Sequence, residues 1–173
     1  REGMELAVSH LKSLGHRKIG YLSHALDSHI MQVRLDAFLK TMKQQELSAD
    51  LSDTGSSHYT SCCVEKHLPR LLSEKQATAI ICSHDLIASA ALVQCQQMGY
   101  RVPEDISIIG FDDLPICAYT SPPLTTVCQD RLQLGKSGYY ALESLRNQVP
   151  IGTLLLHAEL IVRNSTGPVK PVR

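Results

Sequence analysis

The most constraining feature of this sequence is an alternation of short apolar runs with longer segments of helical periodicity. Three runs have the length of buried strands: Ile19–Leu22, Ala77–Cys82 and Ile106–Gly110. Segments with helical spacing of apolar residues precede each run. Strands that are apolar throughout are typical of parallel sheets buried on both sides. The alternation therefore predicts an α/β fold, a doubly wound and mainly parallel sheet with helices on both faces.

Local signals define the predicted helices further. A first helix from Met4 to Leu14 is expected to end at Gly15 through a left-handed cap. Pro69 is expected to kink or split a helix over residues 62–72, because proline lacks the backbone N–H of a helix interior. A short strand is predicted near Leu51. The second predicted helix has an apolar face made of Ile30, Val33, Ala37 and Thr41, flanked by Phe38 and Met42.

The last third of the chain breaks the alternation. We expect a strand over residues 125–129, then a helix, then a half-exposed strand over residues 156–163. The helix face is marked by Leu132, Tyr139, Leu142 and Val149. The tail from Asn164 to Arg173 contains Gly167, Pro168 and Pro171 and is expected to be loose.

Composition excludes several classes of protein. Lys plus Arg and Asp plus Glu each number 17, so the chain lacks the basic excess with which proteins grip DNA phosphates. No run of 18 apolar residues predicts a transmembrane helix. The six cysteines form no Cys-x-x-Cys pair, and we expect Cys82 and Cys95 to be core residues in a reducing cytoplasm rather than metal ligands. Catalytic signatures such as Gly-x-Ser-x-Gly are absent, so neither an enzyme, a metal nor a cofactor is predicted.

Candidate binding residues follow the predicted strands, because loops converge at the carboxyl ends of a parallel sheet. His84 could contact a ligand or be a solvated loop residue, and Asp85 is expected to cap the next helix. Asp112 and Asp113 are expected to point in different directions, so that one could accept hydrogen bonds from ligand hydroxyls. Taken alone, Arg34 beside an apolar helix stripe is expected to extend outward to solvent.

Four motifs carry the analysis from fold to family. They are Gly3-x-x-x-Ala7-x-x-x-Leu11 with Leu14–Ile19, then Thr78–Asp85 continuing to Gly99, then Val102–Asp113, and finally Tyr119 with Pro122–Val127 and Arg163-x-Ser165-Thr166. In this order and spacing the chain resembles the effector-binding core of the lactose/galactose repressor (LacI/GalR) family. The resemblance covers Gly3 to about Thr166.

The resemblance implies two periplasmic-binding-protein-like (type I) lobes, one nearly complete here and the other partial. It also implies that the chain is truncated at its N-terminal side and lacks the DNA-binding head that precedes the lobes. Residues 1–16 resemble the last helix of the N-terminal lobe and residues 17–127 the C-terminal effector-binding lobe. Residues 128–152 resemble a return into the first lobe, residues 153–166 the crossing back, and residues 167–173 a flexible tail. The implied protein is a cytoplasmic transcription regulator, a repressor, that acts as a homodimer and binds operator DNA through a helix-turn-helix head outside this chain.

The resemblance also implies a small sugar-like or nucleoside-like effector. Arg34 and Asp112 match the family's effector contacts, with Phe111 beside them. His84 stands where asparagine is usual, and histidine can titrate near neutral pH. Asp27 and Ser28 fall where small polar residues line the cleft.

Three other interpretations stay open at this point. A periplasmic sugar-binding protein of a transporter shares the fold, although residues 102–113 and 122–127 favour a regulator. An enzyme on a flavodoxin-like sheet would need a nucleophile, a metal set or a phosphate loop. A scaffold without a complete pocket, pairing with a second copy of itself, is the third.

Overall fold

The computed structural model describes residues 1–23, 28–51 and 60–170 of the 173-residue chain. Among these residues, six strands form one sheet in the order β2-β1-β3-β4-β5-β6. The strands are β1 (Lys18–Leu22), β2 (Ser48–Leu51), β3 (Ala79–Cys82), β4 (Ser107–Phe111), β5 (Thr125–Gln129) and β6 (Ala158–Ile161). The first five run parallel, and β6 pairs antiparallel with β5. The predicted mainly parallel sheet is confirmed.

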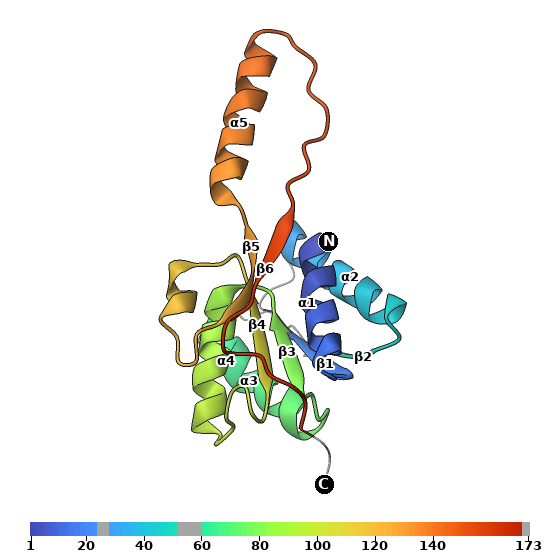
Figure 1. Cartoon of the computed structure of the whole chain (residues 1–173), viewed down its shortest axis with the longest axis vertical. Coiled ribbons are helices and arrows are strands. Elements are labelled where there is room, and N and C mark those ends of the chain that lie inside the picture. Colours follow the sequence, from blue (N-terminus) through green and yellow to red (C-terminus); the bar gives the residue numbers. More distant parts are fainter. Residues whose placement is uncertain (24–27, 52–59, 171–173) are drawn as a thin grey trace.

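Helices cover both faces of this sheet, as Figure 1 shows. They are α1 (Glu2–Ser13), α2 (His29–Gln44), α3 (Thr60–Ser73) and α4 (Asp85–Gln97), with a 3-10 helix, η1 (Pro115–Ala118), after β4. In β3, Ala79 and Ile81 belong to the core beneath α1 and α2, whereas Ile80 and Cys82 belong to the core beneath α3 and α4. Because successive side chains point to opposite faces, a strand covered on both sides must be apolar throughout.

Helix α1 packs on this sheet, which corrects its expected place in another lobe. Its apolar face is fully buried in the same core as Ile19 and Phe38. The fit is close, because a Cβ on Gly3 would lie 2.6 Å from Val127. The helix ends as expected, with Gly15 at a φ of +91° and the His16 amide donating to the Leu11 carbonyl. The other segment boundaries, at residues 127, 152 and 166, stay predictions.

Two expectations about the helices were wrong in detail. The buried face of α2 is made of Ala37, Phe38, Thr41 and Met42. Ile30 and Val33, in the first turns of α2, are exposed. They extend beyond the part of the helix that lies over the sheet core. Helix α3 runs through Pro69 as one helix, so the expected split is wrong, while a kink at Pro69 stays a prediction.

The segment after β6 is anchored rather than loose over residues 164–170. The buried His16 ring contacts the Gly167 carbonyl through Nε2 at 3.0 Å and Thr78 Oγ1 through Nδ1 at 2.9 Å. A carbonyl only accepts, so Nε2 carries the proton. The Val169 amide donates to the Leu14 carbonyl at 3.0 Å. These contacts tie the end of the chain to the loop after α1 and correct the expected flexible tail. Residues 171–173 lie outside the described part.

Beyond β5 the chain leaves the sheet. Helix α5 (Arg131–Arg146) and the extended residues 147–157 rise together from one edge of the body (Figure 1), and we call residues 131–157 the α5 arm. The predicted helix exists, but none of its residues is buried. Its large apolar side chains are exposed: Leu132, Leu134, Tyr139, Tyr140, Leu142 and Leu145.

Candidate functional site

An arginine and an aspartate meet at the carboxyl ends of the parallel strands. Arg34, in the second turn of α2, donates through Nη2 to Asp112 Oδ1 at 2.6 Å. Its Nη1 donates to the Ser83 carbonyl at 2.5 Å. Three separate elements therefore converge, namely α2, the end of β3 and the end of β4. Arg34 and Asp112 therefore lie together at this end of the sheet, as predicted.

Phe111 forms the floor beneath this ion pair. The Arg34 guanidinium carbon lies 3.9 Å from the centre of the Phe111 ring. A cation over an aromatic face gains about 0.5–1 kcal/mol at exposed sites and more where water is excluded. Only 11% of the Arg34 side chain is exposed. The expectation that Arg34 extends outward to solvent is therefore wrong, because a carboxylate, a carbonyl and an aromatic face hold it inward.

The two adjacent aspartates point in different directions, as predicted. Asp113 pairs with Arg163, which follows β6, at 2.8 Å, while Asp112 faces α2. Both aspartates have positive φ, +103° for Asp112 and +47° for Asp113. Such conformations cost energy for residues with a Cβ and persist only where surrounding contacts impose them. The sharp turn after β4 therefore separates two carboxylates that are neighbours in sequence.

The remaining predicted residues have different outcomes. His84 is the N-cap of α4, and its Nδ1 accepts from the Ile87 amide at 3.4 Å. One ring nitrogen therefore turns back to the helix, while the Ser83 carbonyl next to it receives Arg34. Ser28 is the exposed residue before α2 and makes no side-chain capping bond. Asp27 lies outside the described residues.

A cavity of about 590 Å³ adjoins Phe111. It lies among the start of α1, the start of α5 and residues 154–158, and Leu134 and Leu156 line its apolar side. Glu2 closes part of its rim, because its carboxylate accepts from the Ala158 amide at 3.0 Å. A cavity of this size is in the range that holds a small organic molecule.

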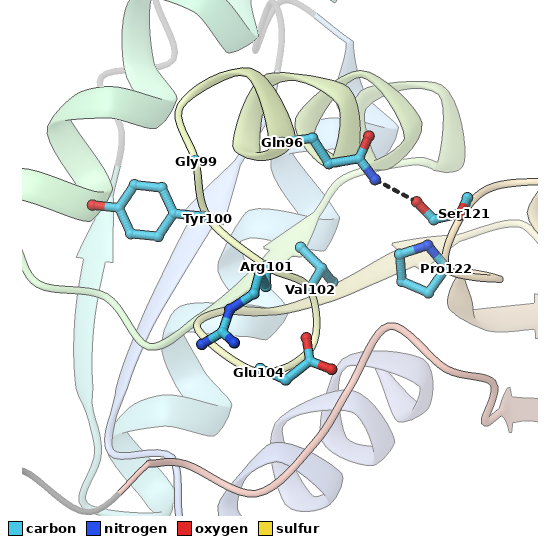
Figure 2. Close-up of a pocket in the computed structure, with 8 residues that line it drawn as sticks. All are labelled: Gln96, Gly99, Tyr100, Arg101, Val102, Glu104, Ser121 and Pro122. Atoms are coloured by element: carbon cyan, nitrogen blue, oxygen red, sulfur yellow. Dashed lines mark hydrogen bonds between the residues drawn. The ribbon is translucent and has the colours of Figure 1, made fainter.

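A second hollow of about 460 Å³ lies at the opposite end of the sheet, where the chain enters β4 (Figure 2). Gln96 donates to the Ser121 carbonyl at 2.7 Å across one side of it, and Tyr100 points its ring away from Pro122 (Figure 2). Arg101 is paired with Asp105 at 2.8 Å. This hollow lacks the inward-facing ion pair of the strand-end site, so we regard the strand-end site as the candidate.

The sequence did not reveal the buried carboxylate that lies behind this site. Asp85 does not cap α4, since His84 does; its carboxylate instead accepts from the Leu114 amide and the Thr126 hydroxyl. Burial raises the pKa of Asp85. The glycine at position 110 was a sequence signal for close packing here, because a Cβ at this position would lie 2.2 Å from Asp85 Oδ1. Local sequence alone does not place β5 beside β4.

Three of the four cysteines whose side chains the structure describes belong to the core. Cys82, Cys95 and Cys117 are buried and Cys128 is half-buried, all as free thiols. Burial raises the pKa of the Cys95 and Cys117 thiols to about 12, which keeps both neutral. Within residues 1–23, 28–51 and 60–170, no three His, Cys, Asp or Glu side chains gather as metal ligands would.

A doubly wound sheet with polar groups converging at its strand ends is the architecture of a small-molecule-binding lobe. The comparison with known sequences gives the family: residues 8–166 match the periplasmic binding protein-like domain, and the chain belongs to that family.

The chain is similar to transcription regulators. It is 34% identical to the HTH-type transcriptional repressor PurR of Aliivibrio salmonicida over 95% of this chain and 50% of PurR. The lac repressor dimer bound to operator and the anti-inducer ONPF superposes with a TM-score of 0.84 at 29% identity, over 95% of this chain and 58% of that one. A LacI family regulator from Enterococcus faecium with bound ribose superposes with a TM-score of 0.82 at 27% identity, over 98% of this chain and 63% of that one. The chain spans about half the length of the curated relatives it matches.

Proposed function

We propose that this chain is the effector-sensing part of a DNA-binding transcription repressor, and that a small sugar- or nucleoside-type effector binds at Arg34 and Asp112. The observation that carries the proposal is their ion pair, held over Phe111 at the strand ends. His84, Ser28 and Asp27 stay proposed contacts around it. Relatives that are repressors support a regulator over the solute-binding protein of a transporter and over an enzyme.

The chemistry of the pair suits hydroxyl-bearing ligands. About a third of the Asp112 side chain, 31%, is exposed, so its carboxylate can accept further hydrogen bonds while it stays paired. Arg34 supplies donors beside it, and its charge is already compensated. Vicinal hydroxyls on a sugar or ribose ring present one donor and one acceptor side by side, which matches this arrangement.

The α5 arm supports the proposed second lobe. Its large apolar side chains are exposed among the described residues, as would be expected of a segment that continues into a second lobe. We propose that residues 128–152 enter that second lobe and residues 153–166 return from it. Operator DNA would be bound by a helix-turn-helix head outside this chain, in a cytoplasmic homodimer. No helix in the described part of the chain is long and apolar enough to cross a membrane.

An effector that bridges two lobes would favour one arrangement of the lobes over another. Such a ligand shifts a population only by its difference in affinity for the two arrangements. Couplings of this kind are typically about 1–3 kcal/mol, enough to change operator affinity by roughly 5- to 150-fold.

The test is a thermal-shift screen of the full-length protein with D-ribose, other neutral sugars and nucleosides. A ligand at 100 times its dissociation constant stabilises the folded state by about 2.7 kcal/mol. We expect Asp112→Ala to remove that stabilisation, because the carboxylate that would accept from the ligand hydroxyls is lost, and each hydrogen bond to a charged group is worth about 1.5–3 kcal/mol.

The matched control is Asp105→Ala. Asp105 is also an ion-paired carboxylate, on Arg101, but it lies at the far end of the sheet. Its variant should respond to each ligand as the unmodified protein does. Calorimetry that finds unchanged ligand affinity in Asp112→Ala would defeat the proposal.

A further inference from the structure

A buried carboxylate lies directly behind the candidate site. Asp85 is fully buried at the first position of α4. Its Oδ2 accepts from the Leu114 amide at 2.7 Å, and its Oδ1 accepts from the Thr126 hydroxyl at 2.5 Å. Hydrogen bonds to an ionisable carboxyl group are among the stronger ones in proteins. Asp85 therefore joins the start of α4 to the chain on either side of the β4–β5 connection.

These bonds enclose the turn that carries Asp112. The Asp112 amide donates to the Val127 carbonyl at 2.8 Å, and the Asp113 amide approaches Thr126 Oγ1 at 3.4 Å. The Thr126 hydroxyl thus accepts from the turn and donates to Asp85. Because Asp112 and Asp113 both have positive φ, their conformation depends on such contacts.

The sheet makes room for this carboxylate. Gly110 pairs with Thr126 across β4 and β5, and a Cβ on Gly110 would collide with Asp85 Oδ1. A side chain at position 110 would therefore displace the carboxylate from both of its partners. Gly110, Asp85 and Thr126 act as one unit.

We propose that Asp85 is a positioning residue for effector binding, which holds the Asp112–Asp113 turn in the conformation that brings Asp112 to Arg34. The proposal rests on the proposed function only for the contact between Asp112 and an effector. The link from Asp85 through Leu114 and Thr126 to the turn stands on the contacts themselves.

The first test needs no ligand and measures backbone amide exchange in the full-length protein. Asp85→Ala and Thr126→Val should each accelerate exchange of the amides of residues 113 and 114 by about tenfold, which corresponds to the upper end of the range for one hydrogen bond. Thr126→Ser keeps the hydroxyl and should retain the slow exchange. Amides of β1 and β3 should keep their rates in all three variants.

Two outcomes would overturn the proposal. One is unchanged exchange at residues 113 and 114 in Thr126→Val, which is a mild enough change to fold even where Asp85→Ala does not. The other is an equal acceleration in β1 and β3, which would mean that Asp85 and Thr126 support the whole fold and not the turn.

The second test uses D-ribose as the probe on the same variants. Thr126→Val should weaken ribose binding about tenfold, and Thr126→Ser should restore it. Full ribose affinity in Thr126→Val, alongside a loosened turn, would overturn the positioning role. If the unmodified protein does not bind ribose or any other ligand of the screen, the proposed function fails, and amide exchange still decides whether Asp85 holds the turn.

Discussion

The sheet body and the α5 arm contain apolar side chains in similar abundance, yet only the body buries them. In the body, made of β1–β6 with α1–α4, Leu11, Phe38 and Ile81 have no exposed surface. In the arm, Leu142 is 67% exposed and Leu155 is 85% exposed. Burying one such side chain stabilises a fold by about 1.5–3 kcal/mol. The body can therefore be stable through its own contacts, whereas the apolar side chains of the arm gain little stabilisation from the described residues.

The largest expected effect comes from truncating one aromatic ring in each region. Phe38 is fully buried and stacks on Tyr21 with ring centres 5.0 Å apart. Phe38→Ala should lower the free energy of unfolding by about 3–5 kcal/mol in urea denaturation. Tyr139→Ala, in the arm, should change it by less than about 0.5 kcal/mol. A comparable loss from Tyr139→Ala would mean that the arm packs against the body.

Glycine-to-alanine substitutions should also distinguish the body from the arm, with smaller effects on stability. Gly110→Ala should destabilise the chain by about 1–3 kcal/mol, because the added methyl group collides with Asp85. Gly138, inside α5, has nothing within 4 Å of an added Cβ. Gly138→Ala should therefore stabilise α5 by about 0.5–1 kcal/mol. Circular dichroism and urea titration would measure both, and a neutral Gly110→Ala would show that the Asp85 carboxylate can move aside freely.

The smallest expected effect is a pH dependence confined to the body. Burial lowers the pKa of His16 from its ordinary 6.5. The unfolded chain then binds a proton more readily than the folded one, so this contribution to stability is complete above about pH 6.5 and is lost as the pH falls below it.

Unfolding free energies measured between about pH 7.5 and pH 5 would reveal this effect, because that range spans the ordinary histidine pKa of about 6.5. His16→Gln should flatten the curve, because it removes the buried ring whose pKa is lowered. The same slope in His16→Gln would place the proton uptake elsewhere in the chain.

Much of this architecture was predictable, because the strands are buried on both faces. Ile80 and Ile81 face opposite sides of the sheet and both sides are buried, so both residues are apolar. Residues 79–82 therefore appear as an unbroken apolar run. Asp112 could be selected because it follows a strand, and parallel strands carry the residues after them to one end of the sheet. Arg34 could be selected only through the family resemblance, because its place beside an apolar helix stripe predicted an outward side chain. The exposure of Val33 could not be predicted from helical spacing. Spacing indicates which face of a helix is buried, but not where along the helix the elements that cover this face end.

By itself, the sequence determined the strands, the helices and the edge of the sheet at which polar side chains gather, because hydrophobic periodicity and turn chemistry act locally. Tertiary structure alone decided that α1 lies on this sheet, that Asp85 serves the turn instead of capping α4, and that α5 stays uncovered. Each of these depends on which distant segment arrives beside a residue, and a one-dimensional pattern does not carry that information. Burial and hydrogen bonding across 29 residues, as between Asp85 and Leu114, exist only in the folded chain.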